Sequence, residues 1–258
     1  PGIERSNAPE TLALFGLAAI SDKQFEKGEK ALLKAIEIDS TNYRIRLALA
    51  GFYRSSENKS ALEWAQLEQA FDSAPKNRQV LKEVISYHLR ADNVKKAEQF
   101  IQSALAKNPT NYDVNLIAGY FSVNQNELAK ALKLFTVASN AKKEGSDLLI
   151  ALSLKGKSEF SLKRIAEAEV TFTRIVNLFP ESESGYKGLL SVYRLNDGAS
   201  AAQSKLELLA KENIVVAPYL VLIQSAILNK DLDTASNYLE KVGEIDPEYE
   251  GFENIRNT

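Results

Sequence analysis

Apolar side chains recur along this chain three and four residues apart, which is the spacing of amphipathic helices. The stretch 97–111, AEQFIQSALAKNPTN, places Ala97, Ile101 and Ala104 on one helical face and ends near the helix breaker Pro109. No segment alternates apolar and polar residues for long enough to predict a strand. The hydrophobic pattern therefore predicts an all-helical chain.

The pattern of 97–111 returns at a nearly constant interval. Counterparts of Ala97 follow it at successive intervals of 34, 37, 34 and 33 residues: Ala131, Ala168, Ala202 and Ala235. Gly28 lies 69 residues before Ala97, close to two periods, and the prolines keep the same spacing, as from Pro75 to Pro109. A period near 34 residues over most of the chain indicates a repeat architecture.

Each period holds two helical patterns joined by a short polar segment. These joints are rich in turn and capping residues, and they lie at 21–24, 55–60, 91–93, 124–127, 195–198 and 229–231. Helices connected by such short turns pack as antiparallel neighbours. We therefore predict a series of antiparallel helix pairs.

These features resemble the tetratricopeptide repeat (TPR), a 34-residue helix–turn–helix unit. That family has a small residue at repeat position 8, alanine at 20, an aromatic residue or leucine at 24, alanine at 27 and proline at 32. Gly16 and Gly119 fall at position 8, Ala97 at 20, Ile101 at 24 and Pro109 at 32. The resemblance implies an all-α fold, an α-solenoid wound as a right-handed superhelix of about seven TPR helix–turn–helix repeats.

On this basis residues 1–258 are expected to form a single TPR solenoid. The repeats are expected near 9–42, 43–77, 78–111, 112–148, 149–182, 183–215 and 216–249, with 250–258 as a tail or the start of a capping helix. Two features depart from the pattern. Glu63 rather than alanine falls at position 20 of repeat 2, and the joint 143–148 is about three residues longer than the period allows. That joint is either a loop or a slight break between a four-repeat half and a three-repeat half.

The composition narrows the partner classes. Lys and Arg number 32 against 34 Asp and Glu, and this net charge of −2 gives no reason to expect nucleic acid or an anionic membrane. The longest apolar runs are far below the ~18 residues of a membrane span, and the start, PGIERSNAPE, lacks a signal-peptide pattern. The compartment stays open between the cytoplasm and a bacterial periplasm or cell envelope reached through a removed signal peptide.

The residue inventory offers little for catalysis. His88 is the only histidine and there is no cysteine, so a catalytic triad or a zinc site lacks its usual groups. The numerous carboxylates predict a solvated surface, and Trp64 is expected to pack in the core. We therefore expect a non-enzymatic protein without a cofactor or a bound metal.

The family resemblance implies that partners bind in a concave groove lined by the first helix of each repeat. Repeat positions 2, 5, 9, 12 and 13 usually face this groove, and they supply these candidates: Arg44, Leu47, Arg54, Lys82, Arg90, Tyr120, Asn124, Lys157, Phe160, Lys187 and Arg194. Basic residues outnumber acidic ones at these positions, so an acidic peptide is the expected partner, with Tyr120 and Phe160 as apolar anchors. In the alternative, these charges pair with carboxylates of adjacent helices.

The expected function is a non-enzymatic protein–protein interaction scaffold that binds a peptide or protein segment in the groove. The repeats are similar in style to bacterial multi-repeat TPR proteins of cell-envelope, exopolysaccharide or exosortase-type sorting assembly. The alternatives are a TPR regulatory half of a larger enzyme or sensor and, against a pI near 5.7, an RNA-binding helical repeat. The two-carboxylate clamp of chaperone-binding TPR domains is not matched, because Lys82 is followed by Ser86 instead of asparagine. The sequence does not indicate an oligomeric state.

Overall fold

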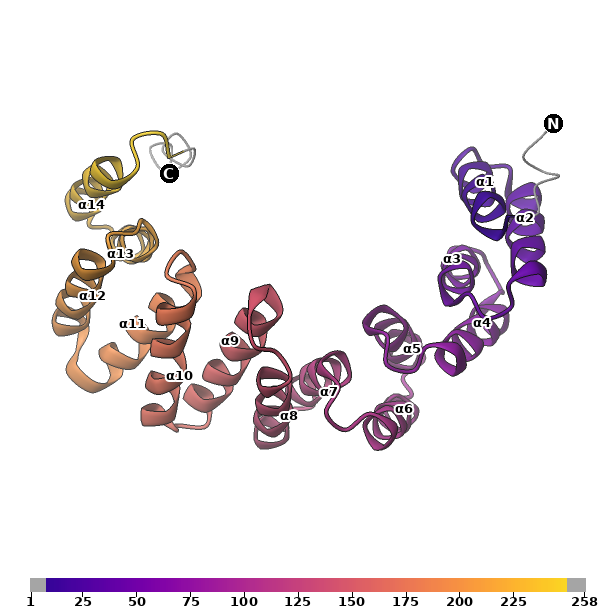
Figure 1. Cartoon of the computed structure of the whole chain (residues 1–258), viewed down its shortest axis with the longest axis horizontal. Helices are drawn as coiled ribbons and strands as arrows, with labels where there is room; N and C mark the ends of the chain where they lie inside the picture. Colours follow the sequence, from indigo (N-terminus) through magenta and orange to yellow (C-terminus); the bar gives the residue numbers. More distant parts are fainter. Residues whose placement is uncertain (1–7, 250–258) are drawn as a thin grey trace. The chain divides into compact units, whose positions relative to one another are not determined.

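The computed structural model describes residues 8–249, and within that range the chain is helical and contains no strand (Figure 1). The helices are α1 (Pro9–Ser21), α2 (Phe25–Ile38), α3 (Tyr43–Arg54), α4 (Ser60–Ser73), α5 (Arg78–Arg90), α6 (Val94–Lys107), α7 (Tyr112–Asn124), α8 (Leu128–Asn140), α9 (Gly145–Ser161), α10 (Ile165–Leu178), α11 (Glu183–Asp197), α12 (Ala199–Asn213), α13 (Ala217–Leu228) and α14 (Leu232–Ile245). Odd-numbered helices are the first and even-numbered helices the second members of successive pairs. The all-α repeat fold is confirmed, whereas the tail or capping helix expected at 250–258 lies outside the described residues.

The chain divides into two compact units, Pro1–Ala118 and Gly119–Thr258. The division falls inside α7, so unit 1 ends and unit 2 begins within the first helix of the fourth pair. Each unit is described by itself below. The expectation of one continuous solenoid over 1–258 stays a prediction.

The long joint at 143–148 is mostly helical. Helix α9 begins at Gly145 and has 17 residues, so the extra residues extend the first helix of repeat 5. Leu148 lies in this extension and is fully buried in the core of unit 2. The segment is therefore neither a loop nor the break between two halves, because burial of Leu148 stabilises the added turn.

The turn inside a helix pair has the same backbone geometry in several repeats. One turn residue adopts a left-handed conformation, as Asp92 and Asn126 do. The following amide then bonds a carbonyl five residues earlier, as Asn93 N does with His88 O at 2.8 Å. This Schellman-type ending satisfies carbonyls that the first helix leaves unpaired, which explains the polar joints of the sequence.

Small residues set the spacing between helices, as the repeat pattern predicts. A Cβ atom added to Gly28 would lie 2.8 Å from the carbonyl oxygen of Gly16 on the facing helix of the same pair. In unit 2, the ring of Phe172 on α10 packs against Gly156 of α9 and Gly188 of α11. The small positions therefore control packing both within a repeat and between neighbouring repeats.

Ile214 ends α12 in a conformation that a β-branched residue rarely adopts. Its φ of 51° and ψ of 47° lie in the left-handed region, and its side chain is 71% exposed. Ile214→Gly is therefore expected to raise the free energy of unfolding by about 1 kcal/mol, because it relieves strain and removes little packing. Chemical denaturation followed by circular dichroism measures the change. Ile214→Ala, which keeps the Cβ atom, is the control and should gain much less; a less stable glycine variant would contradict the assignment of strain.

Candidate functional site

The first helices of unit 2 lie beside one another. Ser153 Oγ of α9 and Ser184 Oγ of α11 are 3.0 Å apart, and Gln224 of α13 donates a hydrogen bond to Glu183 of α11 at 3.0 Å. Helix α11 thus contacts both α9 and α13. We call the exposed surface of these three helices the first-helix face of unit 2.

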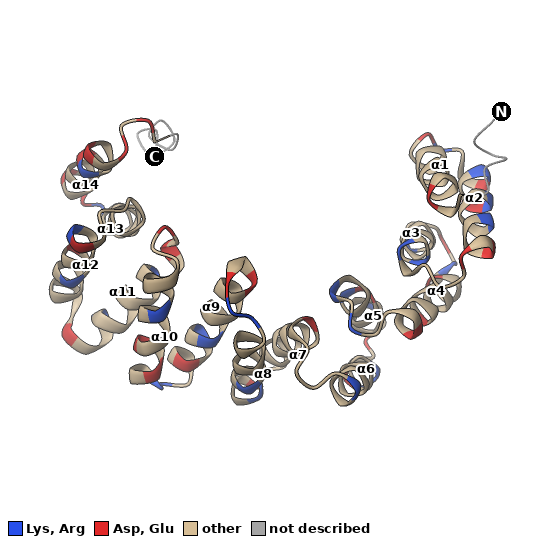
Figure 2. Ribbon diagram, in the orientation of Figure 1, with Lys and Arg blue, Asp and Glu red and all other residues tan. Residues whose placement is uncertain are grey.

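Three of the candidate basic residues lie on the first-helix face. Lys157 of α9 is exposed and forms no ion pair with the described residues. Lys187 of α11 pairs with Glu183 one turn earlier at 2.8 Å, and Arg194 of α11 donates a hydrogen bond to Ser225 of α13. Basic segments of α9 and α11 appear blue in Figure 2. Of these three basic side chains, Lys187 alone forms an ion pair with the described residues, and its partner is Glu183.

Apolar side chains lie on the same three helices. Phe160 of α9 is half-buried and packs against the core of unit 2, and its role as an apolar anchor for a partner stays a prediction. Leu195 of α11 and Leu228 of α13 are exposed, and Leu228 is 83% exposed. Sequence reasoning missed both leucines, although leucine at repeat position 13 in consecutive repeats was a signal that could have found them.

The two candidates on α7 are accessible side chains of unit 2. Tyr120 is 41% exposed, and its ring stands edge-on to Phe135 with 5.8 Å between ring centroids. Asn124 is exposed at the last residue of the helix. Contact of these residues with a partner stays a prediction.

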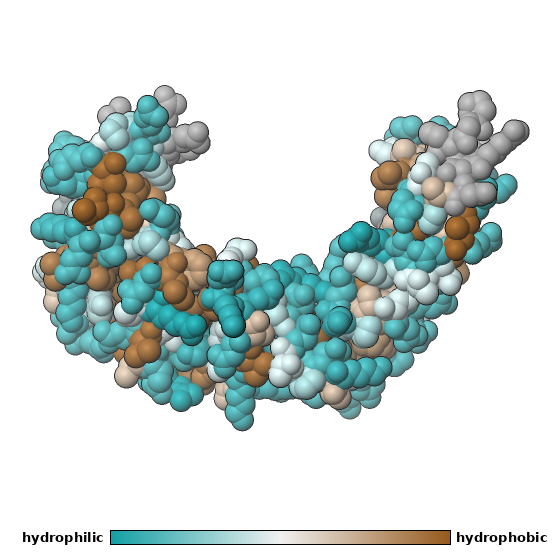
Figure 3. All heavy atoms as spheres, viewed as in Figure 1, coloured by the Kyte–Doolittle hydropathy of each residue, from teal (hydrophilic) through white to brown (hydrophobic). Residues whose placement is uncertain are grey.

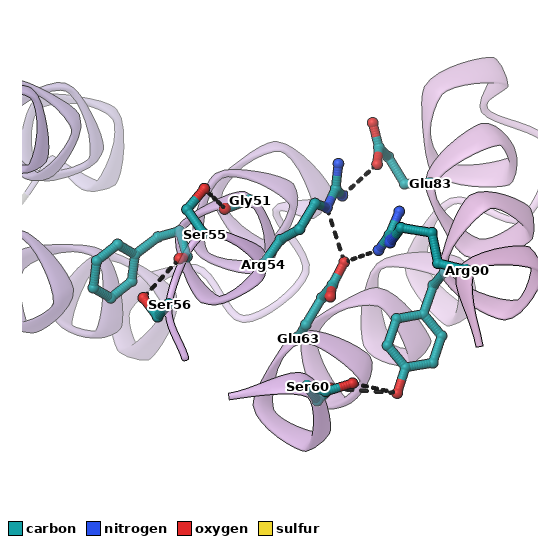
Figure 4. A network of polar contacts seen from close by, with 10 residues as sticks. Gly51, Arg54, Ser55, Ser56, Ser60, Glu63, Glu83 and Arg90 are labelled. Atoms are coloured by element: carbon teal, nitrogen blue, oxygen red, sulfur yellow. Dashed lines mark hydrogen bonds and ion pairs between the residues drawn. The ribbon is translucent and has the colours of Figure 1, made fainter. Parts of the chain in front are cut away.

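In unit 1 two candidate arginines meet a buried carboxylate (Figure 4). Glu63 of α4 accepts a hydrogen bond from Arg54 of α3 at 3.0 Å and from Arg90 of α5 at 2.5 Å. Arg54 also pairs with Glu83 of α5 at 2.5 Å. Burial lowers the pKa of Arg54, but its hydrogen bonds to Glu63 and Glu83 outweigh burial and raise that pKa. Pairing with carboxylates of neighbouring helices, the alternative that the sequence left open, is therefore observed for Arg54 and Arg90.

The other candidates of unit 1 are not part of this network. Arg44 is exposed, with its guanidinium carbon 5.7 Å from the centre of the Tyr43 ring. Lys82 is exposed, and Leu47 is half-buried. Neither basic side chain forms an ion pair with the described residues, and their role as partner contacts stays a prediction.

Two carboxylates are buried, although the sequence predicted a solvated surface for the acidic residues. Besides Glu63, Glu159 of α9 accepts a hydrogen bond from Thr171 at 2.6 Å and pairs with Lys155 at 2.9 Å. Lys155 also donates to Thr171 at 2.8 Å. The prediction was wrong for these two residues because each has basic partners, which offset the cost of burying a charge.

His88 lies inside an aromatic cluster of unit 1. Its ring centroid is 4.5 Å from that of Trp64, 5.3 Å from that of Tyr87 and 5.3 Å from that of Phe100. Its buried Nε2 atom has no hydrogen-bond partner among the described residues. Burial and, second, the positive charge of Lys96 lower the pKa of His88. Trp64 packs in this cluster, and His88 is a structural residue here.

Because its pKa is lowered, His88 is expected to make unit 1 less stable in acid. As pH falls through about 6.5, the ordinary histidine pKa, the unfolded chain binds a proton before the folded chain does, so the free energy of unfolding falls. His88→Phe should remove this part of the pH dependence between pH 7.5 and 5. Urea unfolding followed by the fluorescence of Trp64, the single tryptophan, measures it in both proteins. Equal pH dependence in the two proteins would contradict the role given to His88.

The hollows that we find lie along second helices and at the end of unit 1. One of about 850 Å³ is lined by α10 and Lys143, and one of about 590 Å³ lies between α1 and α2. Among residues 8–249, no three His, Asp or Glu side chains come together as metal ligands would. The same residues include no helix with the length and apolar character of a membrane span. The candidate site is therefore an open surface formed by exposed side chains.

Comparison with known proteins agrees with the helix-pair geometry. Residues 9–42 match the model of the tetratricopeptide repeat. The chain has the TPR fold. Three solved structures share this fold. PilW, described as a widely conserved type IV pilus biogenesis factor, is 20% identical with a TM-score of 0.50, and the match covers 83% of this chain and 98% of that chain. A TPR repeat-containing protein from Cytophaga hutchinsonii is 14% identical (TM-score 0.55, 93% of this chain and 98% of that chain), and a TPR protein from Parabacteroides merdae is 15% identical (TM-score 0.51, 98% of each chain).

At these identities the likeness concerns the TPR fold alone. A search of curated proteins finds no match to the chain. The TPR fold generally forms scaffolds for protein interaction, since stacked repeats present extended surfaces to a partner. The recognition of the TPR pattern in the sequence is therefore confirmed.

Proposed function

We propose that this TPR protein is a non-enzymatic scaffold that binds a protein segment across the first-helix face of unit 2. The observation that supports it is the combination of basic and apolar side chains on three adjacent helices. Lys157, Lys187 and Arg194 supply positive charge, and Leu195 and Leu228 supply exposed apolar surface. A segment that carries carboxylates next to apolar side chains complements both features.

The pairing of the basic residues favours unit 2 over the arginines of unit 1. Arg54 and Arg90 are bound to the buried Glu63, so a partner could take them only by leaving a buried carboxylate unpaired. Lys157 has no such ion pair, and Lys187 forms an exposed pair within one helix, worth about 0.3–0.5 kcal/mol. Binding of a carboxylate by these lysines therefore disrupts little of the fold.

The setting that we propose is protein assembly in a bacterial cell envelope, in the manner of exopolysaccharide or exosortase-type sorting systems. It is supported by the resemblance of the tandem, divergent repeats to those of bacterial multi-repeat TPR proteins. It is also supported by the fold shared with PilW, which is described as a pilus biogenesis factor. Arg44, Leu47, Lys82, Tyr120, Asn124 and Phe160 are kept as further candidate contacts.

Selection of peptides tests the proposed face. A phage-displayed library of random 16-residue peptides is selected on the whole protein, and synthetic versions of the enriched peptides are titrated by fluorescence anisotropy. We expect the enriched peptides to contain carboxylates and apolar residues. Carboxylates are attracted to the basic side chains of the face, and burial of apolar side chains against its exposed leucines stabilises the complex. Lys157→Glu combined with Lys187→Glu should weaken their binding about tenfold or more.

A matched double variant controls for net charge. Lys133→Glu on α8 and Lys211→Glu on α12 change the charge by the same amount at exposed positions of second helices. This control should bind the peptides like the wild-type protein. Equal loss of affinity in both double variants, or enriched peptides without carboxylates, would contradict the proposal.

A further inference from the structure

One carboxylate lies among the basic side chains of the first-helix face of unit 2. Glu183, the first residue of α11, accepts a hydrogen bond from Lys187 Nζ at 2.8 Å and from Gln224 Nε2 of α13 at 3.0 Å. Both donors bond the same oxygen, Oε2. A cation and a neutral amide from two helices therefore converge on one carboxylate oxygen.

These two donors are of the kinds that bind a carboxylate. The ammonium group of a lysine supplies positive charge, and an amide N–H supplies a directed hydrogen bond. Among the described residues, neither donor atom bonds a second acceptor. Both would therefore be available to another carboxylate if the side chain of Glu183 moved away.

The contact between these side chains is open to a partner. Lys187 and Gln224 are exposed, and the side chain of Glu183 is 31% exposed. Figure 3 shows hydrophilic and hydrophobic atoms next to one another over this part of unit 2. A peptide that lies along α11 could therefore reach both donors without opening the core.

Glu183 differs in this respect from the buried carboxylates of the chain. Glu159 of the same unit is 6% exposed and is held by Thr171 and Lys155. Displacing such a group would leave buried polar partners unpaired. The donors around Glu183 can bond water when it leaves, so its displacement costs the fold little.

The other two basic side chains of the face lack such a carboxylate. Lys157 forms no ion pair with the described residues, and Arg194 bonds the hydroxyl group of Ser225. Of the three, Lys187 alone has its charge balanced within the chain. A partner's carboxylate that approaches Lys187 must therefore compete with Glu183.

We propose that Lys187 Nζ and Gln224 Nε2 form a carboxylate-binding subsite, which Glu183 occupies in the free protein and vacates when a carboxylate of the partner binds. This inference rests on the proposed function and assigns a ligand class to one place on the face. Glu183 is thus an intramolecular competitor. A segment without a carboxylate gains nothing here, because Glu183 already satisfies both donors.

Glu183→Gln tests the competition. The amide keeps the shape of the side chain and removes its charge, so it holds the two donors less strongly. The probe is the acidic peptide that binds the wild-type protein most tightly in the peptide selection. It is labelled with fluorescein and titrated by anisotropy into the whole protein. We expect the affinity to rise about threefold.

Glu167→Gln is the matched control. Glu167 also lies in the first turn of a helix of unit 2 and pairs with a nearby basic residue, Arg164, at 3.0 Å, but its helix is the second helix α10. The substitution changes the net charge by the same amount and should leave the affinity unchanged. An equal rise in both variants would overturn the proposal, because net charge alone would then explain the result.

Two further measurements separate a subsite from general attraction. In a Lys187→Gln background, Glu183→Gln should raise the affinity much less, because the cation for which Glu183 competes is absent. Gln224→Ala should weaken binding of the acidic peptide about threefold. It should not change binding of a peptide in which Asn and Gln replace Asp and Glu. Equal weakening of both peptides would show a structural role of Gln224 and would overturn its assignment to the subsite.

The remaining outcomes also decide the matter. Unchanged affinity in Glu183→Gln would overturn the proposal, and lower affinity would overturn it by showing that Glu183 positions Lys187 for the partner. Either result leaves the proposed function standing if the Lys157→Glu and Lys187→Glu double variant loses binding. A selection that enriches no acidic peptide would contradict the proposed function, and this inference with it.

Discussion

Gly188→Leu is expected to lower the free energy of unfolding of unit 2 by about 3 kcal/mol. A Cβ atom at this position would overlap the ring of Phe172, which is buried and also packs against Gly156. The ring has nowhere to move, since a Cβ atom added to Gly156 would already lie 2.7 Å from it. The leucine must therefore push α11 away from α10. Urea denaturation followed by circular dichroism measures the loss.

Gly51→Ala is the matched control for this substitution. Gly51 also lies inside a first helix, but a Cβ atom added there meets no atom within 4 Å. Alanine should therefore stabilise unit 1 by about 0.5–1 kcal/mol through its higher helix propensity. If Gly188→Leu left stability within about 0.5 kcal/mol of wild type, close packing at the small positions would not control the helix spacing.

Glu63→Ala is expected to destabilise unit 1 by about 2 kcal/mol, although alanine is the residue that the TPR pattern has at this position. The substitution leaves Arg54 and Arg90 without their shared carboxylate, which is 6% exposed. The side chains of Arg54 and Arg90 are 36% and 43% exposed and can turn toward water, so the loss is smaller than for a fully buried pair. Denaturant unfolding with Trp64 fluorescence measures it.

Glu83→Ala removes a more exposed partner of the same arginine and serves as the control. Its side chain is 27% exposed and, among the described residues, forms an ion pair with Arg54 only, so we expect a loss below about 1 kcal/mol. The order of the two losses is the informative result. A Glu63→Ala protein as stable as wild type would show that the family preference for alanine outweighs the ion pairs.

The repeat fold could be predicted from the sequence because each helix pair needs the same residue types at the same positions along the chain. Small residues such as Gly16 and Ala97 are needed wherever two helices approach closely, so they recur with the period of the helix pair. Polar joints recur for the same reason, since each first helix ends in a turn that needs a left-handed residue. Both requirements are therefore visible in the order of the residues alone.

The polar contacts of the candidate site could not be predicted in the same way. Groove positions alone do not tell whether an arginine faces water or a carboxylate of another helix. Arg54 and Arg90 meet Glu63 because α3, α4 and α5 place them together, and this meeting depends on helix packing. The exception is Lys155 and Glu159, whose spacing of four residues on one helix was visible in the sequence.

Photo-cross-linking tests the central claim that partners bind the first-helix face of unit 2. A peptide selected on the protein carries a photoreactive residue, and mass spectrometry locates the cross-links. The account predicts cross-links to exposed residues of α9, α11 and α13, lost in the Lys157→Glu and Lys187→Glu double variant. Cross-links confined to the second helices α10, α12 and α14, and unaffected by that variant, would contradict it.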